Sequence, residues 1–380
     1  MTSRLKRMAV VANTDWFLAN FLSGFLALHV ERGVEVTALS PAGRYVDALR
    51  GMGAAWSELP LARGRVSPAN ALIAARALAK ALRETRPDVV HLITAMPVLL
   101  GRWATHPEQK VVSVLPGLGR AFASSDLTSV FDRSIIRWGV GWAAGRPNSR
   151  VVFHQSSDRV RLLGLSGASL SNTALIPGWG VDLHRFSVSR VLQTPPLVVM
   201  ISRMLWTKGV LEFVEAAASC QRVLKARFVL VGGTDEGNPD AIAASQLEAW
   251  SSLGFVEWWG HRQDIPEILS KASVCVLPTK YGEGVPQSLI EAAAAGVPTV
   301  ASDIPGCREV ITQGRNGLLV PPGDSERVAE AVLSLLQAPG LSAKMGRAGR
   351  EIARERFSPT VILDAYRRLY EDLGLDLPET

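Results

Sequence analysis

Short runs of β-branched and other apolar residues alternate along the chain with longer amphipathic runs. In the first half, the short runs predict strands at Met8–Ala12, Glu35–Leu39, Asp88–Ile93, Lys110–Leu115, Arg150–Phe153 and Thr173–Ile176. In the second half, they predict strands at Leu197–Ile201, Arg227–Val231, Val256–Trp259, Val274–Leu277, Thr299–Ala301 and Gly317–Val320. This alternation is typical of α/β domains that are built on parallel sheets.

The chain is 380 residues long, which favours two domains over one. The prolines in Gln193–Pro196 exclude a regular element there, because proline lacks an amide donor and fixes φ. We therefore expect two doubly wound, Rossmann-like domains, residues 1–188 and 189–358, that face a cleft. Helices are predicted at Ser325–Leu336, Ser342–Arg356 and Pro359–Leu373. In such sheets ligands bind beyond the carboxyl ends of the strands.

Composition narrows the class of protein further. Hydrophobic residues make up 47% of the chain and charged residues 20%, which is enough apolar material for packed cores. The three cysteines lie far apart, at Cys220, Cys275 and Cys307, as expected of thiols in a reducing cytosol. The stretch after the basic Met1–Arg7 segment is interrupted by polar residues, and no window is apolar enough to span a bilayer, so we expect a soluble or peripheral protein.

The formal charge is uneven. Residues 1–188 carry +10 and residues 189–380 carry −4. A basic first half suggests an anionic partner. A nucleic acid is not expected, because no reader motif is present. An anionic membrane surface fits better, since the basic half interleaves Trp103, Trp138 and Trp142 with Arg133, Arg137 and Arg146. The alternative, which stays open, is that these tryptophans are core residues and the arginines are merely solvated.

The segment Tyr281–Pro298 reads as a glycine-rich loop that opens a short helix. Gly282 and Gly284 allow backbone amides to approach a ligand, and the helix start directs free N–H groups and a positive dipole end at the same place, which suits a diphosphate. Glu283 lies on the loop and Glu291 inside the helix, so one carboxylate can face a sugar and the other a ribose. The alternative is a glycine-capped surface helix with solvated glutamates.

A second segment, Ser202–Gly209, follows the strand Leu197–Ile201 and places Arg203 and Lys208 at the carboxyl edge of the second sheet. When a nucleoside diphosphate leaves, its negative charge grows, and Arg and Lys side chains stabilise that charge without a metal. Basic residues are common in strand–helix loops, so this segment alone is weak evidence for a diphosphate site. Combined with the glycine-rich loop, it becomes strong evidence. The histidines form no cluster at metal-ligand spacing, and we expect no bound metal and no cofactor.

Together, Arg203…Lys208-Gly209 and Glu283-x7-Glu291 resemble the motifs of the family 4 retaining glycosyltransferases of the GT-B fold. Supporting stretches are Gly178–Phe186 and Gly260–Ile265. The resemblance implies transfer from a nucleotide diphosphate-sugar with retention and without a metal. It also implies that the last helix, within residues 359–380, packs back on the first domain.

By this resemblance, the donor site is assembled from the second domain. The implied roles are diphosphate binding and catalysis for Arg203 and Lys208, contact with the transferred sugar for Glu283, and ribose binding for Glu291. The amides of Gly284 and Val285 add to the phosphate cradle, and His261, Arg262 and Ile265 belong to the nucleobase loop.

The first domain departs from the family pattern, because its first loop lacks a glycine pair and no histidine follows Lys110–Leu115. The candidate acceptor-side residues are Asp15, which could orient or deprotonate an acceptor hydroxyl, and the turn Gly117–Gly119. An aspartate there also suits helix capping. The pattern is similar to bacterial enzymes that extend polyprenyl-diphosphate-linked saccharides.

The predicted function is therefore transfer of a sugar, from a UDP-sugar by subgroup resemblance, to a saccharide acceptor that is linked to a polyprenyl diphosphate. Bacterial surface polysaccharide or glycan assembly, including capsule, at the inner face of the cytoplasmic membrane would be the setting. A nucleotide-sugar epimerase of the same fold and a non-catalytic nucleotide-sugar-binding protein remain alternatives. A dehydrogenase is disfavoured because no G-x-G-x-x-G follows either first strand.

Overall fold

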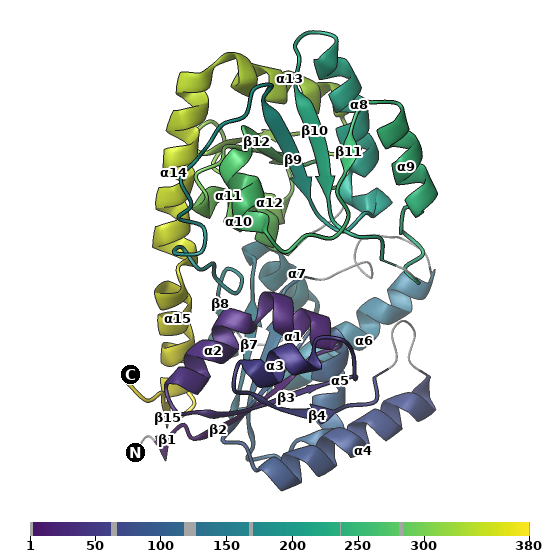
Figure 1. Ribbon diagram of the computed structural model, residues 1–380. Helices are drawn as coiled ribbons and strands as arrows, with labels where there is room; N and C mark the ends of the chain where they lie inside the picture. The colour runs from purple at the N-terminus through teal and green to yellow at the C-terminus, as the bar shows by residue number, and fades with distance from the viewer. Residues whose placement is uncertain are drawn as a thin grey trace. The chain divides into compact units, whose positions relative to one another are not determined.

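The computed structural model describes residues 3–61, 67–117, 127–166, 170–235, 237–280 and 284–379 (Figure 1). The chain divides into two compact units. The first unit is Met1–Gly180 together with Pro359–Thr380, and the second is Val181–Ser358. Each unit holds its own parallel sheet covered by helices, which confirms the two Rossmann-like α/β domains expected from the alternation of short and long apolar runs.

The first unit is built on a seven-stranded parallel sheet of order β4-β3-β2-β5-β6-β7-β8. Its strands are β2 (Arg7–Val11), β3 (Glu35–Ser40), β4 (Ala55–Glu58), β5 (Val89–Ile93), β6 (Lys110–Leu115), β7 (Ser149–Phe153) and β8 (Thr173–Leu175). The helices of this unit are α1 (Asp15–Phe21), α2 (Ser23–Glu31), α3 (Val46–Gly51), α4 (Pro68–Thr85), α5 (Ala95–Ala104), α6 (Leu127–Ala144), α7 (Ser156–Ser166) and α15 (Pro359–Glu371), with a 3-10 turn η2 (Leu170–Asn172). A short parallel pair joins β1 (Ser3–Arg4) to β15 (Leu375–Asp376).

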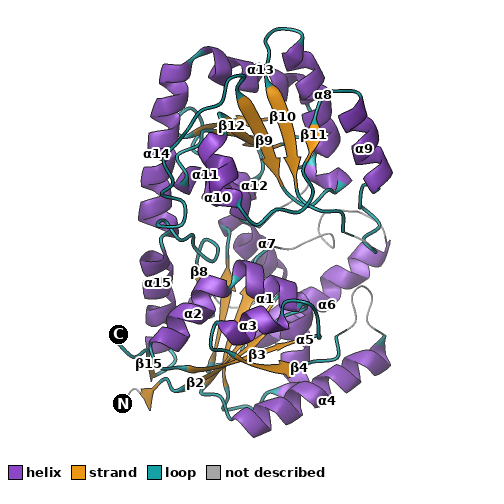
Figure 2. Cartoon of the chain, in the orientation of Figure 1, coloured by secondary structure: helices purple, strands orange, loops and turns teal. Residues whose placement is uncertain are grey.

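Helices cover both faces of the first sheet, as Figure 2 shows. Successive residues of a strand point to opposite faces, and in β2 Met8 and Val10 enter one core while Ala9 and Val11 enter the other. The first core also takes residues of α1, α2 and α15, and the second takes residues of α4, α5 and α6. A sheet that is buried on both faces explains why these strands read as continuous apolar runs.

The last helix, α15, belongs to the core of the first unit although the chain reaches it from the second. Tyr366 and Tyr370 on this helix are fully buried. The Tyr370 hydroxyl lies 3.1 Å from Nε2 of His29 on α2 and 2.9 Å from Nε2 of His91 on β5. A polar bridge inside the core therefore fastens α15 to a helix and to a strand of the first sheet.

The second unit has a six-stranded parallel sheet of order β11-β10-β9-β12-β13-β14. Its strands are β9 (Leu197–Ile201), β10 (Arg227–Val231), β11 (Glu257–Trp258), β12 (Val274–Leu277), β13 (Thr299–Ser302) and β14 (Gly317–Val320). Its helices are α8 (Val210–Gln221), α9 (Ala244–Ser252), α10 (Ile265–Lys271), α11 (Gln287–Ala294), α12 (Pro305–Arg308), α13 (Ser325–Gln337) and α14 (Pro339–Phe357), with a 3-10 turn η3 (Trp206–Lys208) after β9.

The structure corrects the expected domain boundary at residue 188. The backbone N–H of Val181 donates to the carbonyl of Phe357 at 2.8 Å, and both residues belong to the second unit. Val181 and Phe186 are also buried in the core of that unit. The proline segment Gln193–Pro196 is a loop within the second unit, so the break in secondary structure lies after the break between units.

No helix in the part of the chain that the structure describes has both the length and the apolar character needed to cross a membrane.

Candidate functional site

The topology of the second sheet selects one crevice at its carboxyl edge. From β9 the chain moves outward to β10 and β11, and it then returns to place β12 on the other side of β9. Such a switch point is where open parallel sheets bind ligands. The two segments that the sequence singled out follow β9 and β12, so Ser202–Gly209 and the described part of the second segment, residues 284–298, come after the two strands of this switch point.

Backbone contacts bring these two segments together. The Lys280 N–H donates to the carbonyl of Thr207 at 2.8 Å, and the Thr279 hydroxyl donates to the same carbonyl at 3.1 Å. Gly209 has a φ of 81°, and a Cβ at this position would lie 1.9 Å from the carbonyl oxygen of Pro278. Only glycine fits this approach. Lys208, between Thr207 and Gly209, is thereby held beside the strand end that leads into the glycine-rich loop.

Arg203 lies on the same segment, directly after Ser202. Its Nη1 atom is 2.6 Å from Oδ2 of Asp235, and the Arg203 side chain is 45% exposed to solvent. Asp235 follows β10, and the sequence analysis did not single it out. The ion pair directs a half-exposed guanidinium along the carboxyl edge, where an anionic ligand can compete for it.

The loop at residues 260–265 follows β11 and contacts the residues after β10, so it lies at the same carboxyl edge of the sheet. The Gly232 N–H donates to the carbonyl of Gly260 at 2.8 Å, and His261 lies next to Gly233. His261 and Arg262 are exposed, and Arg262 forms a two-bonded ion pair with Asp264 at 2.7 and 2.5 Å. Arg262 lowers the pKa of the Asp264 carboxyl through these hydrogen bonds. Ile265 begins α10. The implied nucleobase loop therefore presents polar groups at the same edge.

Helix α11 carries Glu291 in its interior and begins at Gln287, after Pro286, with no side-chain cap on its first turn. The N-terminal end of a helix, with its positive dipole end, suits an anion. Gly284 and Val285 precede this start and are partly buried. Burial raises the pKa of Glu291 to about 7, while the nearby charge of Arg185 and a hydrogen bond from Gln287 oppose the rise.

The predicted sugar-contacting residue, Glu283, lies outside the described residues, as does Gly282. The structure adds a neighbouring pair that the sequence analysis missed. Nζ of Lys280 is 2.8 Å from Oε1 of Glu212 on α8, whose side chain is 8% exposed. This buried carboxylate fastens the end of the β12 segment to the helix that follows Gly209.

In the first unit, Asp15 occupies the first turn of α1 and is buried. Its two carboxylate oxygens accept hydrogen bonds from the N–H groups of Trp16 and Tyr45, each at 2.8 Å. Thr14, not Asp15, caps the helix. Asp15 therefore holds the Tyr45 turn against α1, and its role toward an acceptor stays a prediction. Of the predicted acceptor-side turn, Gly117 is described and residues 118–119 are not.

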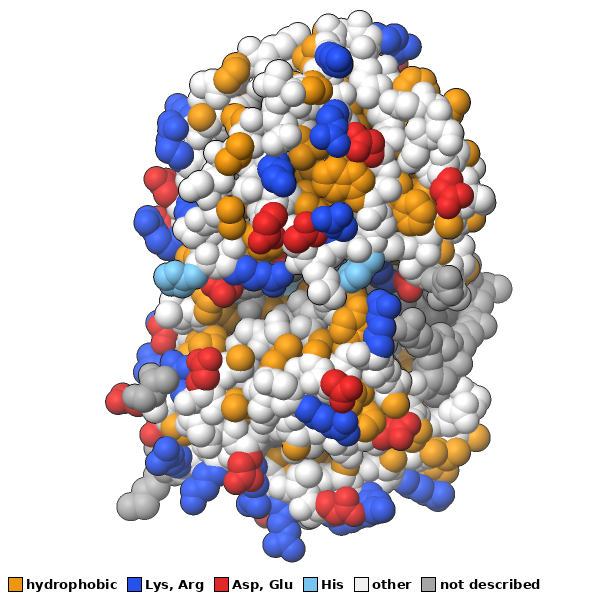
Figure 3. Space-filling model, viewed as in Figure 1, with side chains coloured by type: hydrophobic (Ala, Val, Ile, Leu, Met, Phe, Trp, Pro, Cys, Tyr) orange, Lys and Arg blue, Asp and Glu red, His pale blue; other side chains and the backbone are white. Residues whose placement is uncertain are grey.

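Four of the six residues that suggested a membrane surface have clear environments. Trp142 on α6 is partly buried against the core of the first unit, as the alternative reading expects of a core residue. Trp103 on α5 and Trp138 on α6 are 60% and 46% exposed, and their rings pack with centroids 5.6 Å apart. Arg146 instead donates to the Thr105 hydroxyl at 2.8 Å and to the His106 carbonyl at 2.7 Å, which ties it to a turn of its own unit. Along the lower rim of the first unit in Figure 3, basic side chains lie among acidic ones.

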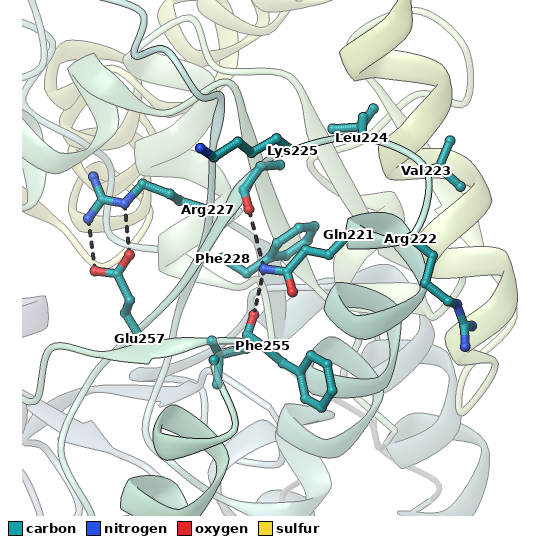
Figure 4. A pocket seen from close by; sticks show the side chains of 12 residues that line it. Gln221, Arg222, Val223, Leu224, Lys225, Arg227, Phe228, Phe255 and Glu257 are labelled. Carbon is teal, nitrogen blue, oxygen red and sulfur yellow. Dashed lines mark hydrogen bonds and ion pairs between the residues drawn. The ribbon is translucent and has the colours of Figure 1, made fainter.

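A surface pocket of about 480 Å³ lies elsewhere in the second unit (Figure 4). It is lined by the turn that follows α8 and by the beginnings of β10 and β11, which places it at the amino edge of the sheet. Arg227 and Glu257 form a two-bonded ion pair on its wall, at 2.7 and 2.8 Å. Because the strands are parallel, this pocket lies at the opposite edge from Arg203 and Glu291. Among the described residues, no group of three or more His, Cys, Asp or Glu side chains could hold a metal ion.

Two protein-family models match the chain, one on each side of the unit boundary. A glycosyl transferase 4-like domain matches residues 22–179, and the glycosyl transferases group 1 model matches residues 195–338. The second match contains the Arg203, Lys208 and Glu291 positions.

Similar proteins cover nearly the whole chain. The chain is 29% identical to the N,N'-diacetylbacillosaminyl-diphospho-undecaprenol alpha-1,3-N-acetylgalactosaminyltransferase of Campylobacter jejuni, over 90% of this chain and 92% of that protein. It is 25% identical to a glycosyltransferase named EpsD of Bacillus subtilis, over 82% and 83% of the two chains. Anabaena HepE in complex with UDP shares the fold, with a TM-score of 0.76 at 18% identity over 97% of this chain and 100% of that chain. This protein belongs to the glycosyltransferases of family 4 type with the GT-B fold.

Proposed function

We propose that this glycosyltransferase moves a sugar from a UDP-sugar, with retention and without a bound metal, to a saccharide linked to a polyprenyl diphosphate. The observation that carries the donor half is the junction of the β9 and β12 segments, which brings Arg203 and Lys208 to the edge where α11 starts. The Campylobacter relative supports the acceptor class, because its name states a diphospho-undecaprenol-linked substrate. The UDP complex of the HepE neighbour supports the nucleotide.

In the proposed reaction, the bond between the anomeric carbon and the diphosphate oxygen breaks, and UDP leaves with the electron pair. The acceptor hydroxyl oxygen forms the new bond on the same face of the sugar, and its proton passes to the departing diphosphate. Arg203, Lys208 and the positive dipole end at the start of α11 stabilise the growing negative charge. Glu291 accepts hydrogen bonds from the ribose, Glu283 faces the transferred sugar, and the loop with His261 borders the base.

We further propose that the enzyme works at the inner face of the cytoplasmic membrane, in the assembly of a bacterial surface polysaccharide. A lipid-linked acceptor is confined to the bilayer, so a docked enzyme meets it more often than a dissolved one. The exposed pair Trp103 and Trp138 supports this proposal, because tryptophan rings favour the interface between headgroups and acyl chains. Arg102, whose guanidinium lies 4.1 Å from the Trp138 ring, adds a cation there.

Calorimetric titration with UDP, GDP, ADP and TDP tests the donor site. We expect selective binding of UDP and its loss in Arg203→Ala. In turnover assays with a lipid-linked acceptor, Lys208→Ala should lower kcat by a factor that corresponds to roughly 2–4 kcal/mol of transition-state stabilisation. Arg327→Ala is the matched control, because Arg327 is an exposed arginine on α13 that pairs with Glu330.

Each outcome separates the alternatives. Near-normal turnover in Lys208→Ala would refute the assignment of this residue. A changed sugar after incubation of the nucleotide-sugar alone would indicate an epimerase. Selective UDP binding without transfer to any acceptor would favour a non-catalytic binding protein.

A further inference from the structure

Arg185 lies beside the loop at residues 260–265 of the candidate donor site. It sits on the segment that enters the second unit, four residues after Val181, and its side chain is exposed. Its Nη2 atom donates to the carbonyl of Gln263 at 3.2 Å, inside the loop at residues 260–265. Burial raises the pKa of Glu291 on α11, and the positive charge of Arg185 opposes that rise. One side chain thus contacts the implied nucleobase loop and acts through its charge on the implied ribose carboxylate.

The backbone of Arg185 is fixed from two sides. Oδ1 of Asp182 accepts hydrogen bonds from the N–H groups of His184 and Arg185, at 2.9 and 3.2 Å, which closes a tight turn. The next residue, Phe186, is buried in the core of the second unit. The backbone from which the Arg185 side chain extends is therefore held in place before a ligand arrives.

A second arginine anchors the same segment to α11. Nη1 of Arg350 on α14 donates to the carbonyl of Phe186 at 3.1 Å and to the carbonyl of Ala294 at 2.7 Å. Ala294 is the last residue of α11. The chain of contacts therefore runs from the end of α11 through Arg350 and Phe186 to Arg185, and from Arg185 to the loop that carries His261 and Arg262.

We propose that Arg185 is a positioning residue for the donor nucleoside: it holds the 260–265 loop at a fixed place relative to α11 and keeps a positive charge beside Glu291. This inference rests on the proposed function, since it deepens the role of the same donor site. Arg185 would act on the nucleoside through Gln263 and Glu291 and would not bind the diphosphate itself.

The groups that act on Glu291 determine how its pKa would change in a variant. They are Arg185 from the entering segment, Gln287 one turn earlier on α11, and Cys275 on β12, whose pKa the Glu291 charge helps to raise. Arg350 reaches the end of the same helix. Replacing Arg185 removes a cation that acts on Glu291, and it leaves the hydrogen bond from Arg350 to the end of α11 intact.

The test is calorimetric binding of uridine, UMP and UDP to the full chain and to Arg185→Gln, between pH 6 and pH 8. If Arg185 positions the nucleoside, the variant should weaken all three ligands by the same factor, about tenfold, because the lost contacts involve a charged group. The pH at which binding is half-maximal should also move upward in the variant. Arg185→Lys should restore part of the pH response but not the contact with Gln263, and Arg327→Ala should change neither.

The outcomes distinguish this inference from the proposed function. A loss confined to UDP would mean direct contact with the diphosphate and would overturn the positioning role. Wild-type affinity and an unchanged pH response in Arg185→Gln would overturn it as well, while leaving the donor site standing. If the wild-type protein bound none of the three ligands, the proposed function would fail and the inference with it.

Discussion

Glu291 is a carboxyl group whose charge changes near neutral pH. Burial raises its pKa to about 7, so the group is about half ionised at pH 7. An ionised carboxylate can accept a charge-assisted hydrogen bond from each ribose hydroxyl, whereas a protonated carboxyl has one oxygen occupied as a donor and accepts more weakly. The affinity for a UDP-sugar should therefore rise about tenfold between pH 6 and pH 8, as the ionised fraction grows. Calorimetric titration across this range measures the effect.

Glu291→Gln provides the control for this prediction. The amide does not titrate, so the affinity of the variant should be flat over the same pH range. The stability of the free protein should show the opposite slope. Because the folded pKa lies above the ordinary value of 4.5, the folded state binds more protons, and this group's contribution to stability falls as pH rises from about 4.5 to 7. Parallel pH slopes in wild type and variant would contradict the assignment of Glu291.

For single residues, the sequence predicts which loop a side chain belongs to better than it predicts which residue that side chain contacts. Arg203 and Lys208 could be assigned to a strand–helix loop because a strongly apolar strand precedes them directly. The partners could not be predicted. Asp235 lies 32 residues from Arg203, and Gln263 lies 78 residues from Arg185. Such pairs form only when the sheet order brings distant loops to one edge, and no local pattern encodes that order.

Among the elements, α15 makes buried polar contacts with the rest of the first unit through the hydroxyl of Tyr370. Tyr370→Phe would leave Nε2 of His29 and of His91 without their partner inside the core. An unsatisfied buried polar group costs about 1–3 kcal/mol, so the free energy of unfolding should fall by about that amount in urea titrations. The affinity for UDP should be unchanged, because these residues belong to the first unit.

Tyr45→Phe is the matched control for the tyrosine bridge. It removes the same hydroxyl from a partly exposed position, where Arg44 is its partner at 2.9 Å and water can replace the lost contact. This variant should stay within a few tenths of a kcal/mol of wild type. Equal losses in the two variants would show that the buried bridge has no special role in holding α15.

The elements were predicted where the pattern is strong and missed where it is weak. The strand β9 has the predicted bounds because Leu197–Ile201 is entirely apolar. The strand β4 was not predicted, because Ala55–Glu58 shows neither alternation nor an apolar run. It is an edge strand, and its pairing with β3 supplies what its own residues lack. The return of α15 to the first unit followed from the family resemblance and not from the residues of the helix.

For the whole molecule, the net charges of the two compact units differ from the charges of the two sequence halves, because the units divide the chain at other residues. The first unit, which includes residues 359–380, holds 23 Lys and Arg and 16 Asp and Glu residues, a net charge of +7. The second unit is left with −1. The asymmetry is smaller than the +10 and −4 expected from the halves, because the acidic end of the chain returns to the basic unit. The basic character of the first unit survives this correction.

Membrane binding should therefore need both the charge of the first unit and its exposed tryptophans. In flotation assays we expect the protein to bind vesicles that contain anionic lipid, to bind neutral vesicles weakly, and to be released by salt, since screening weakens exposed charges. Replacing Trp103 and Trp138 together by serine should lower binding about tenfold or more, because each ring buries a large apolar area at the interface. Leu253→Ser is the control, as this leucine is 65% exposed in the second unit. Binding that ignores lipid charge, or that survives loss of both rings, would place the contact with the acceptor's membrane elsewhere on the molecule.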